Sequence, residues 1–277
     1  MLKLFYITNN PEVALIAEHY GVDRIWIDLE TLGKDVRQKG RNSVKSDHRV
    51  SDISTIKPLL KKAEMLVRIN PWNERSNEEI EAVIEAGADL IMLPMWKTAE
   101  ETEYFLSAVN GRAKTVLLLE TKQAVEVIDE VLEFTFDEIH IGLNDLHLSY
   151  GLTFMFELLA NGTVDFLCEK FKKRGIPFGF GGIARLGYGM LAAEKVIMEH
   201  YRLGSTRAIL SRSFCNINHC EDLQEIERLF RENMEPLRAY ERKCVNASQE
   251  EFIKNRREVQ RRVEIIVDML QSEHNES

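Results

Sequence analysis

The chain has 277 residues, of which 44% are hydrophobic and 29% charged, the composition of an ordinary globular protein with enough apolar material for a core. Its formal net charge of -9 argues against a nucleic-acid backbone or an anionic membrane surface as the main partner. A small anionic substrate is not excluded, because a few local cations decide whether it binds.

The N-terminal stretch MLKLFYITNNPE has no basic region followed by a long apolar run, so no signal peptide is predicted. No stretch approaches 18 uninterrupted apolar residues, so no membrane span is predicted either. The cysteines show no C-x-x-C spacing, which is typical of free thiols in a reducing compartment. We therefore expect a cytoplasmic protein whose four cysteines are unpaired: Cys168, Cys215, Cys220 and Cys244.

Eight short, mostly apolar runs follow one another along the chain, as expected for strands that are covered on both faces. Amphipathic helical patterns lie between them, such as PEVALIAEHYG with proline in its first turn and NEEIEAVIEAGAD with Gly87 as a C-cap. AVEVIDEVLEF and LAAEKVIMEHYRLG follow the same scheme. The predicted strands are LFYIT from Leu4, RIWIDLE from Arg24, EMLVRIN from Glu64, LIMLPM from Leu90, TVLLLE from Thr115, EIHIGL from Glu138, PFGFGG from Pro177 and RAILSR from Arg207.

Eight strand–helix units in this order predict an α/β fold of the (β/α)8 TIM-barrel type. A doubly wound open sheet is the alternative, but it needs no eighth strand and usually has a glycine-rich phosphate loop after the first. Here the first turn reads ITNNPE and contains no glycine. The sequence therefore favours the barrel.

Two segments exceed a minimal barrel. The first is a polar, basic stretch from Thr31 to about Ser54, predicted as a long functional or disordered loop. The second is a pair of helices from about Glu221 to Leu270, the last opening with a capping box at Ser248 and Glu251. We expect a barrel domain over 1–245 and a helical extension over 246–277. The extension carries an apolar stripe at helical spacing, which favours a subunit contact over packing on its own barrel. The stripe comprises Phe252, Val259, Val263, Ile266 and Leu270.

Active sites of this fold lie at the C-terminal ends of the strands. Glu120 ends a row that alternates onto one face with Val116 and Leu118, and Asp145 follows the neighbouring strand. An acid that closes so apolar a run requires a cation or a metal. Two carboxylates with water and substrate oxygens commonly hold magnesium or manganese. Taken alone, Asp145 is equally explained as a helix N-cap, and Arg68 at the end of strand three as a structural ion-pair partner.

The stretches DRIWIDLE, LVRINPWNERS, EAGADLIMLPMWKTAEE, VLLLETKQAVEVIDEVL and IHIGLNDLHLSYGL together resemble the HpcH/HpaI aldolase and citrate lyase family of phosphoenolpyruvate- and pyruvate-binding barrels. The similarity extends from strand two through strand eight. It includes an arginine ending strand three, Pro-Met after strand four, Glu-Thr after strand five and G-x-x-D-L after strand six.

The resemblance implies that Glu120 and Asp145 hold Mg²⁺ or Mn²⁺ and that Arg68 binds the substrate carboxylate. A divalent ion bound to a 2-oxo acid would polarise its carbonyl group, and Arg68 would fix the plane of the carboxylate with two hydrogen bonds. The residues expected to bind substrate are Arg68, Pro94, Met95, Gly142, Asn144 and Arg185.

The chain departs from the family at the proton-transfer position. Thr31 stands where family aldolases usually carry histidine and citrate lyase-like members aspartate, and Leu118 stands where the family has glutamine. His48, in the loop after strand two, is the first candidate for a replacement base. Asp28 is expected to orient a metal-bound water, and His147 is an alternative base. His140, in mid-strand, is expected to be structural.

Two further features carry alternatives. Lys97 near the barrel mouth would allow Schiff-base chemistry if an apolar pocket depressed its pKa, but the carboxylates would then have no role. The run FGFGGIARLGYG, with Arg185, Ser211 and Arg212 nearby, would suit a phosphorylated or carboxylated substrate tail, or the glycines merely serve the tight turn.

We thus expect a class II, metal-dependent lyase of the aldolase type that acts on a 2-oxo acid, with a pyruvate-like donor and an aldehyde. A citrate lyase-like acyl-CoA lyase and a barrel that binds a 2-oxo acid without turnover are the alternatives. The expected partners are these small molecules and further copies of the chain in a homo-oligomer, with no nucleic acid or membrane.

Overall fold

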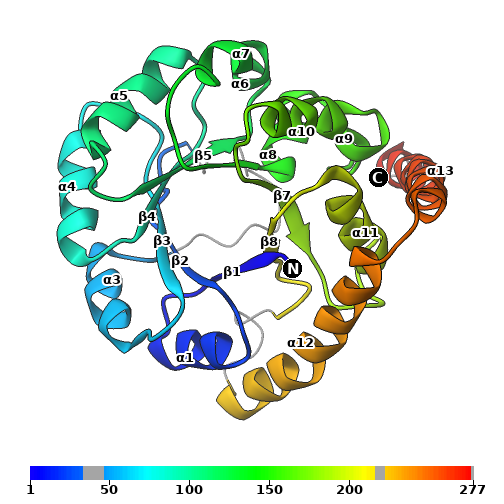
Figure 1. Ribbon diagram of the computed structural model, residues 1–277, viewed down its shortest axis with the longest axis horizontal. Coiled ribbons are helices and arrows are strands. Elements are labelled where there is room, and N and C mark those ends of the chain that lie inside the picture. Colours follow the sequence, from blue (N-terminus) through cyan, green and yellow to red (C-terminus); the bar gives the residue numbers. More distant parts are fainter. Residues whose placement is uncertain (34–46, 216–221, 276–277) are drawn as a thin grey trace.

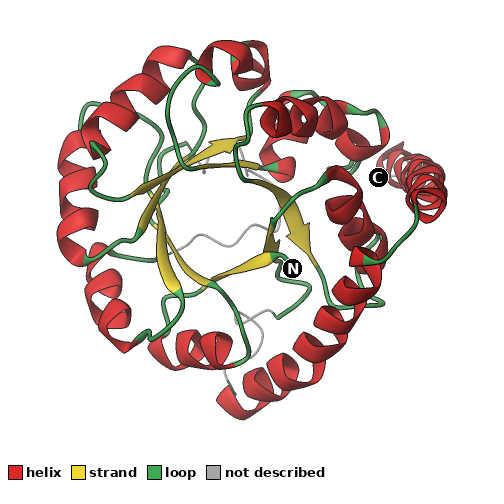
Figure 2. Ribbon diagram, viewed as in Figure 1, coloured by secondary structure: helices red, strands yellow, loops and turns green. Residues whose placement is uncertain are grey.

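The computed structural model of the chain describes residues 1–33, 47–215 and 222–275. Eight parallel strands pair in chain order and β8 closes on β1, so the sheet has no free edge (Figures 1 and 2). The predicted (β/α)8 barrel is therefore confirmed. The strands are β1 Lys3–Ile7, β2 Arg24–Asp28, β3 Glu64–Arg68, β4 Leu90–Leu93, β5 Lys114–Leu119, β6 Glu138–Ile141, β7 Phe178–Ile183 and β8 Arg207–Leu210.

Helices form a ring around the strands, as Figure 1 shows. Several of the predicted helix ends have the expected caps: α1 begins with Pro11 after the N-cap Asn10, and α4 ends at left-handed Gly87. The elements outside the sheet are α1 Pro11–His19, α3 Val50–Ile56, η1 Lys57–Leu59, α4 Ser76–Ala86, α5 Ala99–Val109, α6 Lys122–Glu126, α7 Ile128–Val131, α8 Leu143–Ser149, α9 Glu157–Ala160, α10 Thr163–Lys173, α11 Ala193–Leu203, α12 Leu223–Val245 and α13 Gln249–Asn275.

The segment predicted as a loop up to Ser54 contains the start of helix α3, which begins at Val50. The apolar residues of this short helix, Ile53 and Ile56, are fully buried and dock it on the barrel. The prediction of an irregular loop is thus wrong for its last residues, because a two-residue apolar pattern was too short to indicate a helix. Residues 34–46 of the same prediction lie outside the described part of the chain.

The inner wall of the barrel is layered. Every second residue of a strand faces inward, and the middle of the barrel is filled by an apolar cluster separate from the core under the helices. Below it, at the N-terminal ends of the strands, the fully buried Arg24 bonds Glu138 at 2.6 and 2.7 Å. The inner cluster consists of Phe5, Trp26, Leu66, Leu90, Met92, Val116 and Leu118, with Ile7 and Ile209 packed against it.

The charged layer closes the bottom of the barrel. Arg207 also bonds Glu138 with two hydrogen bonds of 2.7 Å, and Arg24 reaches Glu64 at 2.9 Å. Burial raises the pKa of Glu138, but the hydrogen bonds from Arg24 and Arg207 outweigh it and lower the pKa to about 2. With this end filled by paired charges, the opposite end of the strands is left as the place for a site.

The last helix, α13, lies outside the ring of barrel helices and packs on α9 and α11 (Figure 1). Three members of the predicted stripe, Val259, Val263 and Ile266, are buried within this single chain. Asn255 adds hydrogen bonds to Lys195 and Glu199 of α11. The stripe that the sequence favoured for a subunit contact is therefore buried in large part against the barrel of its own chain.

The predicted capping box of α13 is present: the Glu251 amide donates to Ser248 Oγ, and the Ser248 amide donates to the Glu251 carboxylate. Helix α12 ends at Val245, and we propose that the barrel domain ends there and that residues 246–277 form an extension. Cys168 and Cys244 are free thiols as predicted, Cys215 is buried, and Cys220 lies outside the described residues. No helix in the described part of the chain is long and apolar enough to cross a membrane.

Candidate active site

The C-terminal rim of the barrel carries the charged residues that the sequence singled out. Asp28 and Arg68 are the last residues of β2 and β3, and Glu120 directly follows β5. Gly142 directly follows β6 and is the N-cap of α8, which places Asp145 in the first turn of that helix. The alternation of each strand therefore brings these side chains to one end of the barrel, opposite the layer formed by Arg24.

Arg68 is bound on one side by carboxylates. Its Nε and Nη2 donate to the two oxygens of Asp28, each at 2.9 Å, and Nη2 lies 3.3 Å from Oε2 of Glu30. Burial lowers the pKa of Arg68, but the charges of Asp28 and Glu30 raise it well above its ordinary value, with a further contribution from Glu120. Arg68 is thus a permanent cation that interacts electrostatically with the carboxylate of Glu120.

The Asp28 contact uses only one edge of the guanidinium group. Among the described residues, none accepts a hydrogen bond from Nη1 of Arg68. The side chain is 13% exposed, and its Cζ lies 5.1 Å from the ring centroid of Trp26. Arg68 is therefore fixed by a carboxylate and an aromatic ring while the Nη1 edge remains able to bind a further anion.

Glu120 is almost completely buried, with 2% of its surface exposed. Its Oε1 accepts a hydrogen bond of 3.1 Å from the backbone amide of Met95. Met95 has a φ of 55°, a left-handed conformation that costs free energy for a residue with a side chain. The strained turn after β4 thus directs an N–H group at the carboxylate that the sequence predicted as a metal ligand.

Gly142 makes close approach to Glu120 feasible. A Cβ atom at this position would lie 2.7 Å from Oε2 and 2.9 Å from Cβ of Glu120, so any other residue would displace that side chain. Gly142 also begins the helix that carries Asp145. The close contact between these two strand ends explains why glycine is required here.

The oxygen donors at this rim fit a hard divalent cation. Glu120 and Asp145 supply carboxylate oxygens, the ligands that Mg²⁺ and Mn²⁺ prefer in proteins. Within residues 1–33, 47–215 and 222–275, no three His, Cys, Asp or Glu side chains gather as a metal-binding set. From the described part of the chain, a metal at this rim would therefore have no more than two such side chains as ligands.

His48 lies against the end of β2, with its Nδ1 accepting a 3.0 Å hydrogen bond from the Asp28 amide. A neutral histidine that accepts at Nδ1 carries its proton on Nε2. It then presents an N–H group and has no second lone pair with which to accept a proton. In this arrangement His48 is a hydrogen-bond donor, which argues against the general-base role expected from the sequence.

Thr31 points toward the end of β3. Its amide and hydroxyl groups donate to Oδ1 of Asn70 at 2.9 and 3.3 Å, and its side chain is exposed. His147 is buried with Nδ1 3.1 Å from the Leu143 carbonyl of its own helix. His140 is buried in the barrel wall with Nε2 3.2 Å from the Gly181 carbonyl, consistent with the expected structural role.

The remaining predicted residues differ in exposure. Pro94 is buried beside Met95, whereas Asn144 is exposed in the first turn of α8. Arg185 follows β7, where its Cζ lies 4.1 Å from the ring centroid of Tyr188 and its Nε lies 3.4 Å from the Ser213 carbonyl. Lys97 is exposed, so the apolar pocket that a Schiff-base lysine requires is not supplied there.

Sequence reasoning did not single out Trp26 as a contributor to the site, and it did not predict the backbone conformation of Met95. Trp26 lies one inward step below Asp28 and under Arg68, and the alternation of β2 was a signal that could have found it. The left-handed backbone of Met95 had no such signal, because nothing in the residue type predicts a positive φ.

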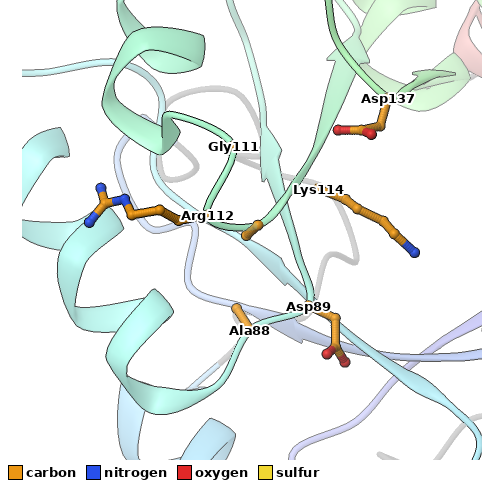
Figure 3. Close-up of a pocket in the computed structure, with 7 residues that line it drawn as sticks. Ala88, Asp89, Gly111, Arg112, Lys114 and Asp137 are labelled. Carbon is orange, nitrogen blue, oxygen red and sulfur yellow. The ribbon is translucent and has the colours of Figure 1, made fainter.

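A pocket of about 400 Å³ lies elsewhere on the molecule (Figure 3). Its lining residues immediately precede β4, β5 and β6 or, in the case of Lys114, begin β5, so it opens at the N-terminal rim. Asp89 and Lys114 already pair with Lys57 and Glu64, respectively. In this fold, residues at the rim opposite the active site contribute to stability. We therefore assign this pocket no role in the candidate site. It is lined by Ala88, Asp89, Gly111, Arg112, Ala113, Lys114 and Asp137.

Comparison with known proteins agrees with the sequence-based resemblance. The sequence model of the HpcH/HpaI aldolase/citrate lyase family matches residues 2–155, more than half of the chain. The matched span includes Asp28, Arg68, Glu120 and Asp145. No curated protein sequence matches the chain. The family is one of aldolases and citrate lyases, which supports a lyase-type function.

Several solved structures share the fold. An HpcH/HpaI aldolase from Desulfitobacterium hafniense DCB-2 is 14% identical, with a TM-score of 0.60 over 82% of this chain and 93% of that one. RipC from Yersinia pestis is 16% identical, with a TM-score of 0.55 over 83% and 95%. The citrate synthase SbnG is 17% identical, with a TM-score of 0.57 over 81% and 92%. At these identities the likeness establishes the barrel fold alone.

Proposed function

The chain belongs to the HpcH/HpaI aldolase/citrate lyase family, and within it we propose a divalent-metal-dependent carbon–carbon lyase of the aldolase type that acts on a 2-oxo acid. One observation carries the proposal: the cation of Arg68 ends β3 and the buried carboxylate of Glu120 directly follows β5, so both lie at the C-terminal rim. An anion-binding group next to an oxygen ligand is the arrangement that a metal-bound 2-oxo acid requires.

In this proposal Glu120 and Asp145 hold Mg²⁺ or Mn²⁺. When bound, such an ion polarises a carbonyl group and stabilises negative charge that develops on its oxygen. The Met95 amide fixes Oε1 of Glu120, so the orientation of the carboxylate is set before any ligand arrives. Gly142 provides the space in which Oε2 of Glu120 approaches the start of α8.

Arg68 binds the carboxylate of the substrate through its Nη1 edge. Asp28 occupies the other edge and holds the guanidinium plane through two hydrogen bonds, which limits how the substrate can be oriented. His48 fixes the end of β2 through the Asp28 amide and thereby acts on the position of Arg68 indirectly. Pro94, Met95, Gly142 and Asn144 would border the bound acid, and Arg185 would meet its distal end.

Proton exchange on pyruvate tests the proposal without knowledge of the aldehyde. An aldolase of this type removes a proton from the methyl group, so the methyl signal of pyruvate in deuterated water should decay in the presence of the protein and Mg²⁺ or Mn²⁺. Glu120→Gln should abolish the decay, while Glu126→Gln, a change on an exposed helix position, should not. An equal decay rate in Glu120→Gln and the parent would contradict the proposal.

A non-catalytic barrel that binds a 2-oxo acid is the second candidate, and the position of Thr31 favours it. The hydroxyl group is engaged with Asn70 at the exposed edge of the site, and it is not a base at neutral pH. Tight oxalate binding with no methyl exchange in the parent protein would support this candidate. The citrate lyase-like acyl-CoA reaction has no comparable observation in its favour.

A further inference from the structure

Trp26 occupies the level of the barrel directly below the candidate site. It lies two residues before Asp28 on the inward face of β2 and is 2% exposed. Its neighbours in the inner cluster are apolar side chains, among them Leu66, Met92 and Leu118. The indole ring thus forms part of the boundary between the apolar interior and the charged rim.

The indole N–H is a buried hydrogen-bond donor for which the described residues supply no acceptor. Among residues 1–33, 47–215 and 222–275, no atom accepts a hydrogen bond from Nε1 of Trp26. Burying a donor without an acceptor carries a penalty that proteins rarely accept without a compensating partner. The side chains of the inner cluster are apolar and have no acceptor to offer, whereas the layer directly above them is the charged rim.

The indole ring also lies against the guanidinium group of Arg68. The guanidinium carbon lies 5.1 Å from the ring centroid, within the range of a cation–aromatic attraction. Arg68 is held from the other side by Asp28. A ligand that binds the Nη1 edge of Arg68 would bring oxygen acceptors to the rim residue that lies directly over this ring.

We propose that Trp26 is a substrate-binding residue whose indole N–H donates to an oxygen of the anion bound by Arg68. The inference rests on the proposed function, since it takes the anion to be a small oxo acid or dicarboxylate bound together with a divalent ion. It makes Trp26 a specificity determinant at the deep end of the site. Substrates that place an oxygen there bind, whereas substrates that place a purely apolar group there leave the donor unsatisfied.

Oxalate affinity in Trp26→Phe tests this. Phenylalanine keeps an aromatic ring under Arg68 but removes the donor, so with Mn²⁺ present the dissociation constant for oxalate should rise by about tenfold or more, the effect of one hydrogen bond to a charged acceptor. Trp96→Phe is the matched control, because Trp96 also has a buried Nε1 without an acceptor among the described residues but packs in the outer core. Its oxalate affinity should equal that of the parent.

A second measurement covers the case in which Trp26→Phe does not fold. The protein has three tryptophans, and Trp72→Phe/Trp96→Phe leaves Trp26 as the only one. Its fluorescence emission should shift when oxalate is added with Mn²⁺. An unchanged emission at saturating oxalate, or equal oxalate affinity in Trp26→Phe and the parent, would overturn the inference alone. A parent that binds no oxalate would contradict the proposed function itself.

Discussion

Asp28 and Arg68 face each other in register at the ends of neighbouring strands, and two parallel hydrogen bonds of 2.9 Å join them. The contact fixes the plane of the guanidinium group and offsets part of the cost of burying it. The guanidinium group is therefore ordered before a substrate binds. Arg68 is positioned by the fold, and the substrate meets it in one orientation.

The first prediction concerns this pair. Arg68→Lys keeps the charge but cannot form two parallel hydrogen bonds, so oxalate binding in the presence of Mg²⁺ should weaken by about 1–3 kcal/mol. Asp28→Asn keeps the shape but leaves Arg68 less firmly oriented, and should weaken binding by a smaller amount. Calorimetric titration measures both. If Arg68→Lys bound oxalate as tightly as the parent, another residue would have to bind the carboxylate.

The left-handed backbone of Met95 leads to a second prediction. Glycine tolerates a φ of 55° and valine does not, so Met95→Val should be less stable than Met95→Gly by about 1–3 kcal/mol in chemical denaturation. If the Met95 amide also orients Glu120, Met95→Val should lose Mn²⁺ affinity as well. Asn110→Val, at the other non-glycine residue with a positive φ in the described part of the chain, is the control that should lose stability and keep Mn²⁺ affinity. Equal stability of Met95→Val and Met95→Gly would contradict the strain.

His48 and Thr31 give the third prediction. A general base contributes about 10²–10⁴-fold to a proton-transfer rate, but His48 accepts the Asp28 amide at Nδ1. His48→Ala should therefore reduce methyl-proton exchange of pyruvate by clearly less than 100-fold, mainly through disorder at the end of β2. A larger loss, rescued by added imidazole, would restore His48 as the base. Thr31→His should increase the exchange if the site lacks only that group.

A fourth prediction follows from two buried histidines on either side of β7. Burial lowers the pKa of His140 to about 4 and, together with the charge of His140, that of His200 to about 3. Because the folded-state values lie below the ordinary value of 6.5, the neutral forms stabilise the fold. That stability is complete above pH 6.5 and is lost as the pH falls toward 4 and then 3.

Each of these histidines should contribute on the order of 3 kcal/mol to this acid loss. Denaturation curves measured between pH 7 and pH 4 should show that the free energy of unfolding falls less in His200→Phe than in the parent. The phenylalanine ring in this variant can still stack on Phe180. In His19→Gln, a change at an exposed position, the free energy of unfolding should fall as much as in the parent. A decline in His200→Phe as steep as in the parent would show that other groups, such as His140, dominate the acid response between pH 7 and pH 4.

The sequence predicted the barrel because each strand was a separate apolar run between capped helices, so local signals were sufficient. It also predicted that Asp28, Arg68, Glu120 and Asp145 would share one rim, since the first three end strands or directly follow them and Asp145 lies in the helical turn after β6. What it did not predict were the pairings on that rim. The contact between Asp28 and Arg68 depends on the register of β2 against β3, and no spacing along one strand encodes that register.

Two other differences between the sequence-based predictions and the structure have related causes. A helical stripe such as that of α13 indicates burial but not the surface that covers it, which here is α9 and α11 of the same chain. His48 is separated from Asp28 by a long polar segment, so its hydrogen bond to the Asp28 amide had no sequence signal. Both depend on contacts between residues that are distant in the sequence.

The central claim is that Glu120 and Asp145 together bind the divalent ion, and calorimetric titration with Mn²⁺ tests it most directly. Glu120→Gln and Asp145→Asn each remove one ligand charge and preserve the shape of the side chain, so thermal unfolding should remain cooperative while Mn²⁺ binding is lost in both. Glu126→Gln should bind as the parent does. Parental Mn²⁺ affinity in both Glu120→Gln and Asp145→Asn would contradict the account.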